Sequence, residues 1–138
     1  MEKIYSKIEP NKLLHIIFRK EDFKSGRTNL IDEMEFIQCS ALNLVIGTTF
    51  KPHKHIERNI TFSNHIAQES WCIIQGSVKC IFYDLNDEIL ETPILNAGDT
   101  SFTLRGGHTY EILEDDTLVM EYKVGPYFGQ QLDKIFIQ

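Results

Sequence analysis

Short apolar runs separated by turn-forming clusters fill the second half of the chain. The runs are rich in β-branched and aromatic residues, and they end at Gly, Asn or Asp, which is typical of strands joined by tight turns. They predict strands at 70–74, 78–83, 88–95, 100–104, 108–113 and 117–124. Gly76 lies between the first two, which are expected to form a hairpin. Six or seven short strands at roughly ten-residue spacing indicate an antiparallel sandwich or barrel.

The first half is less regular. A short strand is expected at 15–18, and Arg27-Thr28-Asn29 is expected in a loop. Residues 36–46 are apolar with small or polar residues interleaved, which favours a strand ending at Gly47. The polar stretch 56–68 is expected to be a loop, with a possible short strand at 60–62.

Four residues with metal-binding side chains stand out from this pattern. His53 and His55 are two positions apart on a segment expected to be extended, so their rings project from the same face. Glu69 lies at the start of a predicted strand, and His108 follows a Gly-Gly pair. Three imidazoles and a carboxylate suit a borderline divalent ion if they converge. The alternatives are exposed strand histidines, a solvated carboxylate and a turn histidine.

The spacing of these residues resembles the first motif of the cupin family, which consists of small jelly-roll barrels with a metal in the interior. Gly47 is followed by five residues and then His53-Lys54-His55, and Glu69 is followed by six residues and then Gly76. Both halves match the family pattern. The stretch 56–68 between them is longer than usual and is interpreted as an insertion in a loop that could carry binding residues.

A second cupin motif is matched in part. Gly98 and Gly106 keep the family spacing, while His108 comes one residue early, and Leu104 and Ile112 replace the family's proline and asparagine. The resemblance implies an all-β cupin fold, with residues 1–34 as an N-terminal extension packing on the barrel or a partner subunit, and 35–138 as the cupin domain. It also implies a divalent metal (Zn, Fe, Mn or Ni) bound by His53, His55, Glu69 and His108.

Three further residues are candidates for binding a substrate. Arg58 and Arg105 could clamp a carboxylate or phosphate, and Tyr110 could line a pocket. The alternatives are ordinary exposed arginines and a core aromatic. His15 and His65 are expected to be unliganded, because nothing around them repeats a metal-binding spacing.

The function remains open between three classes. The first is a metal-dependent isomerase, epimerase, lyase or oxygenase. The second is a non-catalytic module that binds a sugar or small acid, and the third is a metal-free isomerase or epimerase with a histidine base. The tail 121–127, with Asp133-Lys134, resembles small cupins that accompany bacterial surface-polysaccharide synthesis, which implies a sugar or nucleotide-sugar as substrate.

Length, charge and cysteine content limit the kinds of partner and compartment expected for this protein. The 138 residues suit one domain, and the net charge of −6, with scattered Lys and Arg, argues against nucleic acid. The three cysteines, Cys39, Cys72 and Cys80, are interpreted as buried thiols in a reducing compartment. No segment has the pattern of a signal peptide or membrane span, so a cytoplasmic location is expected. The cupin resemblance implies a homodimer acting on a small molecule.

Overall fold

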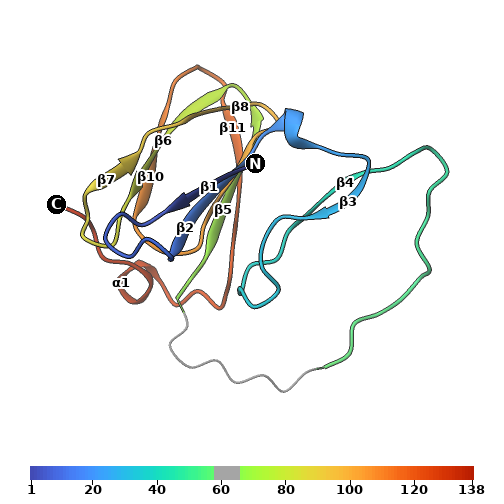
Figure 1. The fold of residues 1–138 in the computed structure, drawn as a ribbon, viewed down its shortest axis with the longest axis horizontal. Helices are drawn as coiled ribbons and strands as arrows, with labels where there is room; N and C mark the ends of the chain where they lie inside the picture. The colour runs from blue at the N-terminus through green and yellow to red at the C-terminus, as the bar shows by residue number, and fades with distance from the viewer. Residues whose placement is uncertain (58–65) are drawn as a thin grey trace.

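The structure is a computed structural model that describes residues 1–57 and 66–138, and it shows an all-β fold with antiparallel strand pairing (Figure 1). The described strands are β1 (Glu2–Tyr5), β2 (Leu13–Phe18), β3 (Gly26–Asn29), β4 (Ser40–Asn43), β5 (Glu69–Gln75), β6 (Ser77–Tyr83), β7 (Ile89–Glu91), β8 (Ile94–Asn96), β9 (Thr100–Thr103), β10 (His108–Ile112) and β11 (Leu118–Lys123). The described helices are the 3-10 turn η1 (Lys20–Asp22) and α1 (Gln130–Asp133). Neither helix could span a membrane.

The strands form a main sheet, a second sheet and a ribbon. The main sheet has the order β1-β2-β9-β5-β11. In the second sheet β6 pairs with β10, β7 and β8, and the ribbon consists of β3 and β4. Within the part of the chain that the structure describes, β11 is an edge of the main sheet and β10 is an edge of the second.

The main core lies between the two sheets. Ile17 and Ile73 from the main sheet pack in one cluster with Phe82 and Leu95 from the second sheet, and all four side chains are fully buried. Burying an aliphatic or aromatic side chain of this size contributes roughly 1.5–3 kcal/mol. This core therefore holds the two sheets face to face.

A second core covers the opposite face of the main sheet. Ile16 and Phe102 pack there against Leu30 and Ile31, and Ala41 of the ribbon joins them. Because side chains alternate along a strand, Ile16 and its neighbour Ile17 point to opposite faces. Strand β2 is therefore buried on both sides, which explains why five of its six residues are apolar.

Five of the six predicted strands of the second half are confirmed, whereas the one predicted at 88–95 is divided into β7 and β8. The predicted hairpin is wrong. Strands β5 and β6 belong to different sheets. Gly76 lies between them with φ of 76°, a conformation that glycine adopts without steric penalty. The chain therefore passes at Gly76 from the main sheet to the second sheet.

The first half differs more from expectation. Residues 27–29 form part of β3 instead of a loop, because they pair with residues 40–42 of the strand predicted at 36–46. That strand is shorter than predicted and ends at Asn43. Residues 1–34 contribute β1 and β2 to the main sheet itself. The possible strand at 60–62 lies outside the described residues.

Candidate functional site

Two of the four predicted metal ligands lie in direct contact. Nε2 of His108 is 3.2 Å from Oε1 of Glu69, and both side chains are largely buried. Adjacent ligand atoms of an ion with bonds of about 2.1 Å lie about 3.0 Å apart at octahedral angles and about 3.4 Å apart at tetrahedral angles. The pair therefore has the spacing of two neighbouring ligands on one ion.

Strand alternation directs both side chains into the layer between the sheets. Glu69 lies on the same face of β5 as Trp71 and Ile73, which belong to the main core. His108 pairs directly across from Phe82, which is fully buried in that core. The register of β5 and β10 therefore places the carboxylate and the imidazole on facing interior surfaces.

Aromatic rings form one wall of this site. The Trp71 ring lies 5.0 Å from the His108 ring and 4.1 Å from the Tyr110 ring, both edge to face. The indole N–H of Trp71 donates to Oε2 of Glu121 at 3.4 Å. Tyr110 therefore lines the same interior space as the carboxylate–imidazole pair, at the position predicted for substrate binding.

The C-terminal tail covers the other side. Lys123 lies directly across the strands from Glu69, and its Nζ donates to Asp133 at 3.2 Å. The Tyr127 ring lies 4.0 Å from the same Nζ. A Cβ added at Gly107, the neighbour of His108, would meet Cδ1 of Ile137, so the tail lies close to this part of the chain. The tail thus packs against β11 and against the residue that precedes β10.

The charges around Glu69 keep it ionised. Burial by itself raises the pKa of Glu69, but the hydrogen bond and charge of His108, together with the charges of Lys134 and Lys123, lower it below its ordinary value. The pKa of Tyr110 is raised by burial and by the carboxylates of Glu121 and Glu69. The site therefore offers an anionic oxygen ligand and a neutral phenol.

One ring nitrogen of His108 forms no hydrogen bond with the described residues. Its Nδ1 is buried and has no hydrogen-bond partner among the described residues. Leaving a buried donor or acceptor unsatisfied is unfavourable by roughly 1–3 kcal/mol.

The other two predicted ligands lie elsewhere. His53 and His55 are exposed on a segment without strand structure, contrary to the expected extended strand. Their rings are 5.5 Å apart, and Nδ1 of His53 lies 3.0 Å from the Lys51 carbonyl. Within residues 1–57 and 66–138, no three His, Cys, Asp or Glu side chains gather into a metal-binding group.

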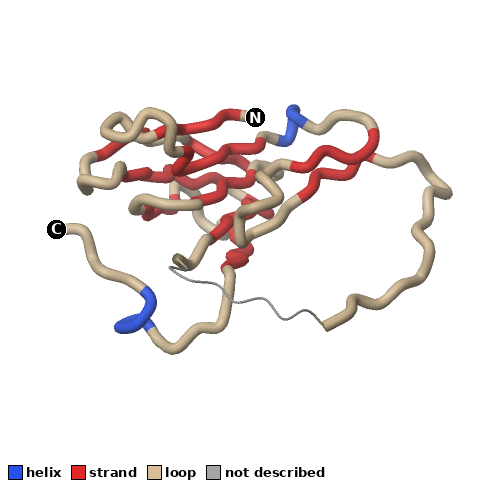
Figure 2. Tube along the Cα trace, turned by 60° about the horizontal axis from the view of Figure 1, so that its bottom comes forward, coloured by secondary structure: helices blue, strands red, loops and turns tan. Residues whose placement is uncertain are grey.

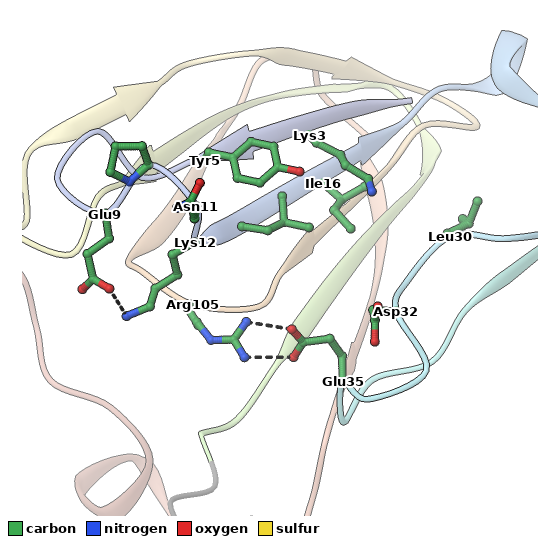
Figure 3. Close-up of a pocket in the computed structure, with 12 residues that line it drawn as sticks. Lys3, Tyr5, Glu9, Asn11, Lys12, Ile16, Leu30, Asp32, Glu35 and Arg105 are labelled. Atoms are coloured by element: carbon green, nitrogen blue, oxygen red, sulfur yellow. Dashed lines mark hydrogen bonds and ion pairs between the residues drawn. The ribbon is translucent and has the colours of Figure 1, made fainter.

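Arg105, a predicted substrate ligand, faces a different hollow (Figure 3). Its guanidinium forms two hydrogen bonds with the Glu35 carboxylate, at 2.8 and 3.2 Å. The hollow has a volume of about 720 Å³ and lies on the ribbon side of the main sheet, where Ile16 and Leu30 line it. It does not include Glu69 or His108. Arg58 lies outside the described residues.

His15 has protein partners at both ring nitrogens. His15 is fully buried, stacked 4.3 Å from the Phe82 ring, with Nδ1 3.1 Å from the Thr103 hydroxyl and Nε2 3.3 Å from the Tyr83 carbonyl. A carbonyl only accepts, so Nε2 carries the proton and Nδ1 accepts from Thr103. Burial, with the charge of His108, lowers the pKa of His15 to about 4, against opposing effects of Tyr83 and Asp84.

Sequence reasoning missed Lys123 and Glu121. Both lie on the face of β11 that looks onto the site, together with Val119 of the main core. The alternation of residues 119, 121 and 123 was visible, but it became informative only with the register against β5. The three cysteines are free thiols, of which Cys80 is buried and Cys39 and Cys72 are half-buried.

Comparisons with protein-family models, with curated proteins and with solved structures found no match to this chain. The candidate site therefore rests on its geometry. A buried carboxylate–imidazole pair with an aromatic wall can bind a metal ion, or it can act as a proton-transfer pair in which the carboxylate orients the imidazole.

Proposed function

We propose that the protein is a cupin-type jelly-roll barrel that binds a divalent metal through Glu69, His108, His53 and His55. The observation that carries this proposal is the 3.2 Å contact between Glu69 and His108 in the layer between the sheets. The spacing is that of adjacent metal ligands, and the cupin motifs include both residues.

The open edge of β10 could pair with a strand that carries the two remaining histidines, His53 and His55. A strand added beside β10 would have alternate residues on the interior face, next to His108. His53 and His55 are two positions apart, so both would point inward, while Lys54 would point outward. The donor set of three imidazoles and one carboxylate suits Zn, Fe, Mn or Ni.

We further propose that the protein is an enzyme acting on a small polar metabolite such as a sugar or nucleotide-sugar. A bound divalent ion supplies Lewis-acid polarisation of a carbonyl or hydroxyl, or redox chemistry if it is iron or manganese. The Tyr110 phenol could hold or donate a proton, and Trp71 gives a flat surface on which a sugar ring can pack. The Lys123 ammonium balances the charge of Glu69.

The same pair also supports a metal-free alternative. A carboxylate hydrogen-bonded to an imidazole is the arrangement of a histidine general base, in which Glu69 would orient the ring and stabilise its protonated form. A non-catalytic sugar-binding module is the remaining candidate, favoured by the tail that packs over β10 and β11.

Elemental analysis and turnover distinguish these candidates. The purified protein should carry close to one divalent ion per chain, and His108→Ala and Glu69→Gln should lose it, while the exposed β10 variant Glu111→Gln should retain it. Turnover on a sugar-nucleotide panel that chelation abolishes would support the enzyme. Activity in fully metal-free protein would support the histidine base, and bound metal without turnover would favour the binding module.

A further inference from the structure

Residues 44–57, hereafter the arm, form an exposed apolar segment. The arm leaves the ribbon at the end of β4 and runs outside the sheets in both views (Figures 1 and 2). Val45, Ile46, Phe50 and Ile56 are 77%, 103%, 62% and 80% exposed. Large apolar side chains gathered on one unpaired segment indicate that the segment is buried against something in the working protein.

Among the described residues, the interior face of β10 is only partly covered. Tyr110 and Ile112 lie on the interior face of β10, across from Cys80 and Val78, which are fully buried. Tyr110 and Ile112 are nevertheless 36% and 50% exposed. The described part of the chain pairs β10 only with β6, so the backbone groups along its other edge are open to a further strand.

The charges of the two surfaces are complementary. The arm carries Lys51, Lys54 and one carboxylate, Glu57, which gives a formal charge of +1 with neutral histidines. Residues 108–123, which form β10, β11 and their connection, carry five carboxylates and one lysine, a formal charge of −4. Attraction between them would favour this pairing over contacts between two arms.

We propose that the arm pairs with the β10 edge of a second copy of this chain, and that the exchange is reciprocal. Each β10 would gain a neighbouring strand, and each interior would gain apolar side chains over Tyr110 and Ile112. Two copies related by a two-fold axis would exchange identical arms, so the assembly closes as a dimer. This inference rests on the proposed function, under which each metal site would combine His53 and His55 of one copy with Glu69 and His108 of the other.

A second copy fits better than the molecule's own arm. The ribbon from which the arm departs packs on the outer face of the main sheet, whereas β10 belongs to the second sheet. The arm leaves the ribbon outward and then curves back, and it stays outside the sheets along its course (Figures 1 and 2). A second copy can meet an arm in this position without any change in the body.

Co-expression of two inactivated chains tests the exchange. One chain carries His53→Ala and His55→Ala, the other carries Glu69→Gln and His108→Ala, and different affinity tags isolate the mixed dimer. With exchanged arms, one of its two sites combines an intact arm with an intact body, so metal content should return to about half of the wild-type value. Each variant alone should bind no metal at these sites.

The outcomes separate the exchange from the proposed function. A metal-binding wild-type dimer whose mixed form gains no metal would overturn the exchange and leave the metal site standing. A monomeric wild type would also overturn it. If the wild type binds no metal, the proposed function fails, and the exchange is judged by oligomeric state alone.

Light scattering after size-exclusion chromatography measures the oligomeric state independently of metal content. Ile46→Asp with Phe50→Asp should convert the dimer to a monomer, because two carboxylates would be buried in the apolar contact. Thr48→Asp with Thr49→Asp adds the same charge to the arm without removing apolar side chains and should weaken the dimer less. A dimer unaffected by Ile46→Asp with Phe50→Asp would contradict the exchange.

Discussion

Acidification should destabilise this protein through His15. The side chain is fully buried in its neutral form, with Nδ1 accepting from Thr103 and Nε2 donating to the Tyr83 carbonyl. Protonation of Nδ1 would remove the acceptor that Thr103 uses and would place a charge in the core. The pKa of His15 is lowered from 6.5 to about 4, mainly by burial.

The sign and size of the effect follow from that difference. Between pH 6.5 and 4 the unfolded chain binds a proton at His15 and the folded chain does not, so the free energy of unfolding falls as pH falls. Each unit of pKa difference corresponds to about 1.4 kcal/mol. From pH 7 to pH 4.5 the loss due to His15 is therefore roughly 2.5 kcal/mol.

Urea denaturation at these two pH values measures the loss. His15→Gln should remove the His15 component, because a glutamine amide can donate to the Tyr83 carbonyl and accept from Thr103 without titrating. Equal pH dependence of wild type and His15→Gln would refute the assignment of His15 as a buried neutral imidazole.

Two further substitutions test the fold. Asp84→Asn should lower the free energy of unfolding at pH 7 by roughly 1.5–3 kcal/mol. The reason is that the Asp84 carboxylate accepts hydrogen bonds from the Ser6 hydroxyl at 2.5 Å and from the backbone N–H groups of Lys7 and Leu85. An unchanged midpoint of urea denaturation would contradict this prediction. Gly76→Ala should be more destabilising than Gly26→Ala in thermal melts. Both positions have positive φ, but only at Gly76 would the added Cβ meet another residue, Thr117. Equal effects of the two substitutions would show that this contact is unimportant.

The strands of the second half were predictable because each apolar run ends at a turn-forming cluster. The arrangement of those strands was not predictable to the same extent. A glycine between two strands suits a hairpin turn as well as a passage from one sheet to another, and Gly76 makes the passage. Only the long-range pairing of β5 with β9 and β11 decides between them.

The β3–β4 ribbon is a second case in which local sequence did not predict the strand pairing. Residues 27–29 are polar and resemble a loop, yet they form a strand because the partner at 40–43 supplies the hydrogen bonds and Ala41 packs into the second core. Strand propensity depends strongly on such context. The apolar residues Leu44, Val45 and Ile46 continued the predicted strand, but the described chain gives them no pairing.

Two of the four residues selected by motif spacing lie together in the structure. Motif spacing selected Glu69 and His108, which lie 3.2 Å apart despite the one-residue offset of the histidine. The placement of His53 and His55 depends on what pairs with β10, which strand alternation within one chain does not determine. Lys123 and Glu121 enter the site through the register of β11, which no local pattern encodes.

The most direct measurement of the central claim is a crystal structure of the metal-loaded protein with anomalous diffraction data collected at the absorption edge of the bound element. The account predicts one ion in the layer between the sheets, bound by Oε1 of Glu69, by His108, and by the imidazoles of His53 and His55. An ion bound away from Glu69 and His108, or a metal-loaded preparation without an ion between the sheets, would contradict it.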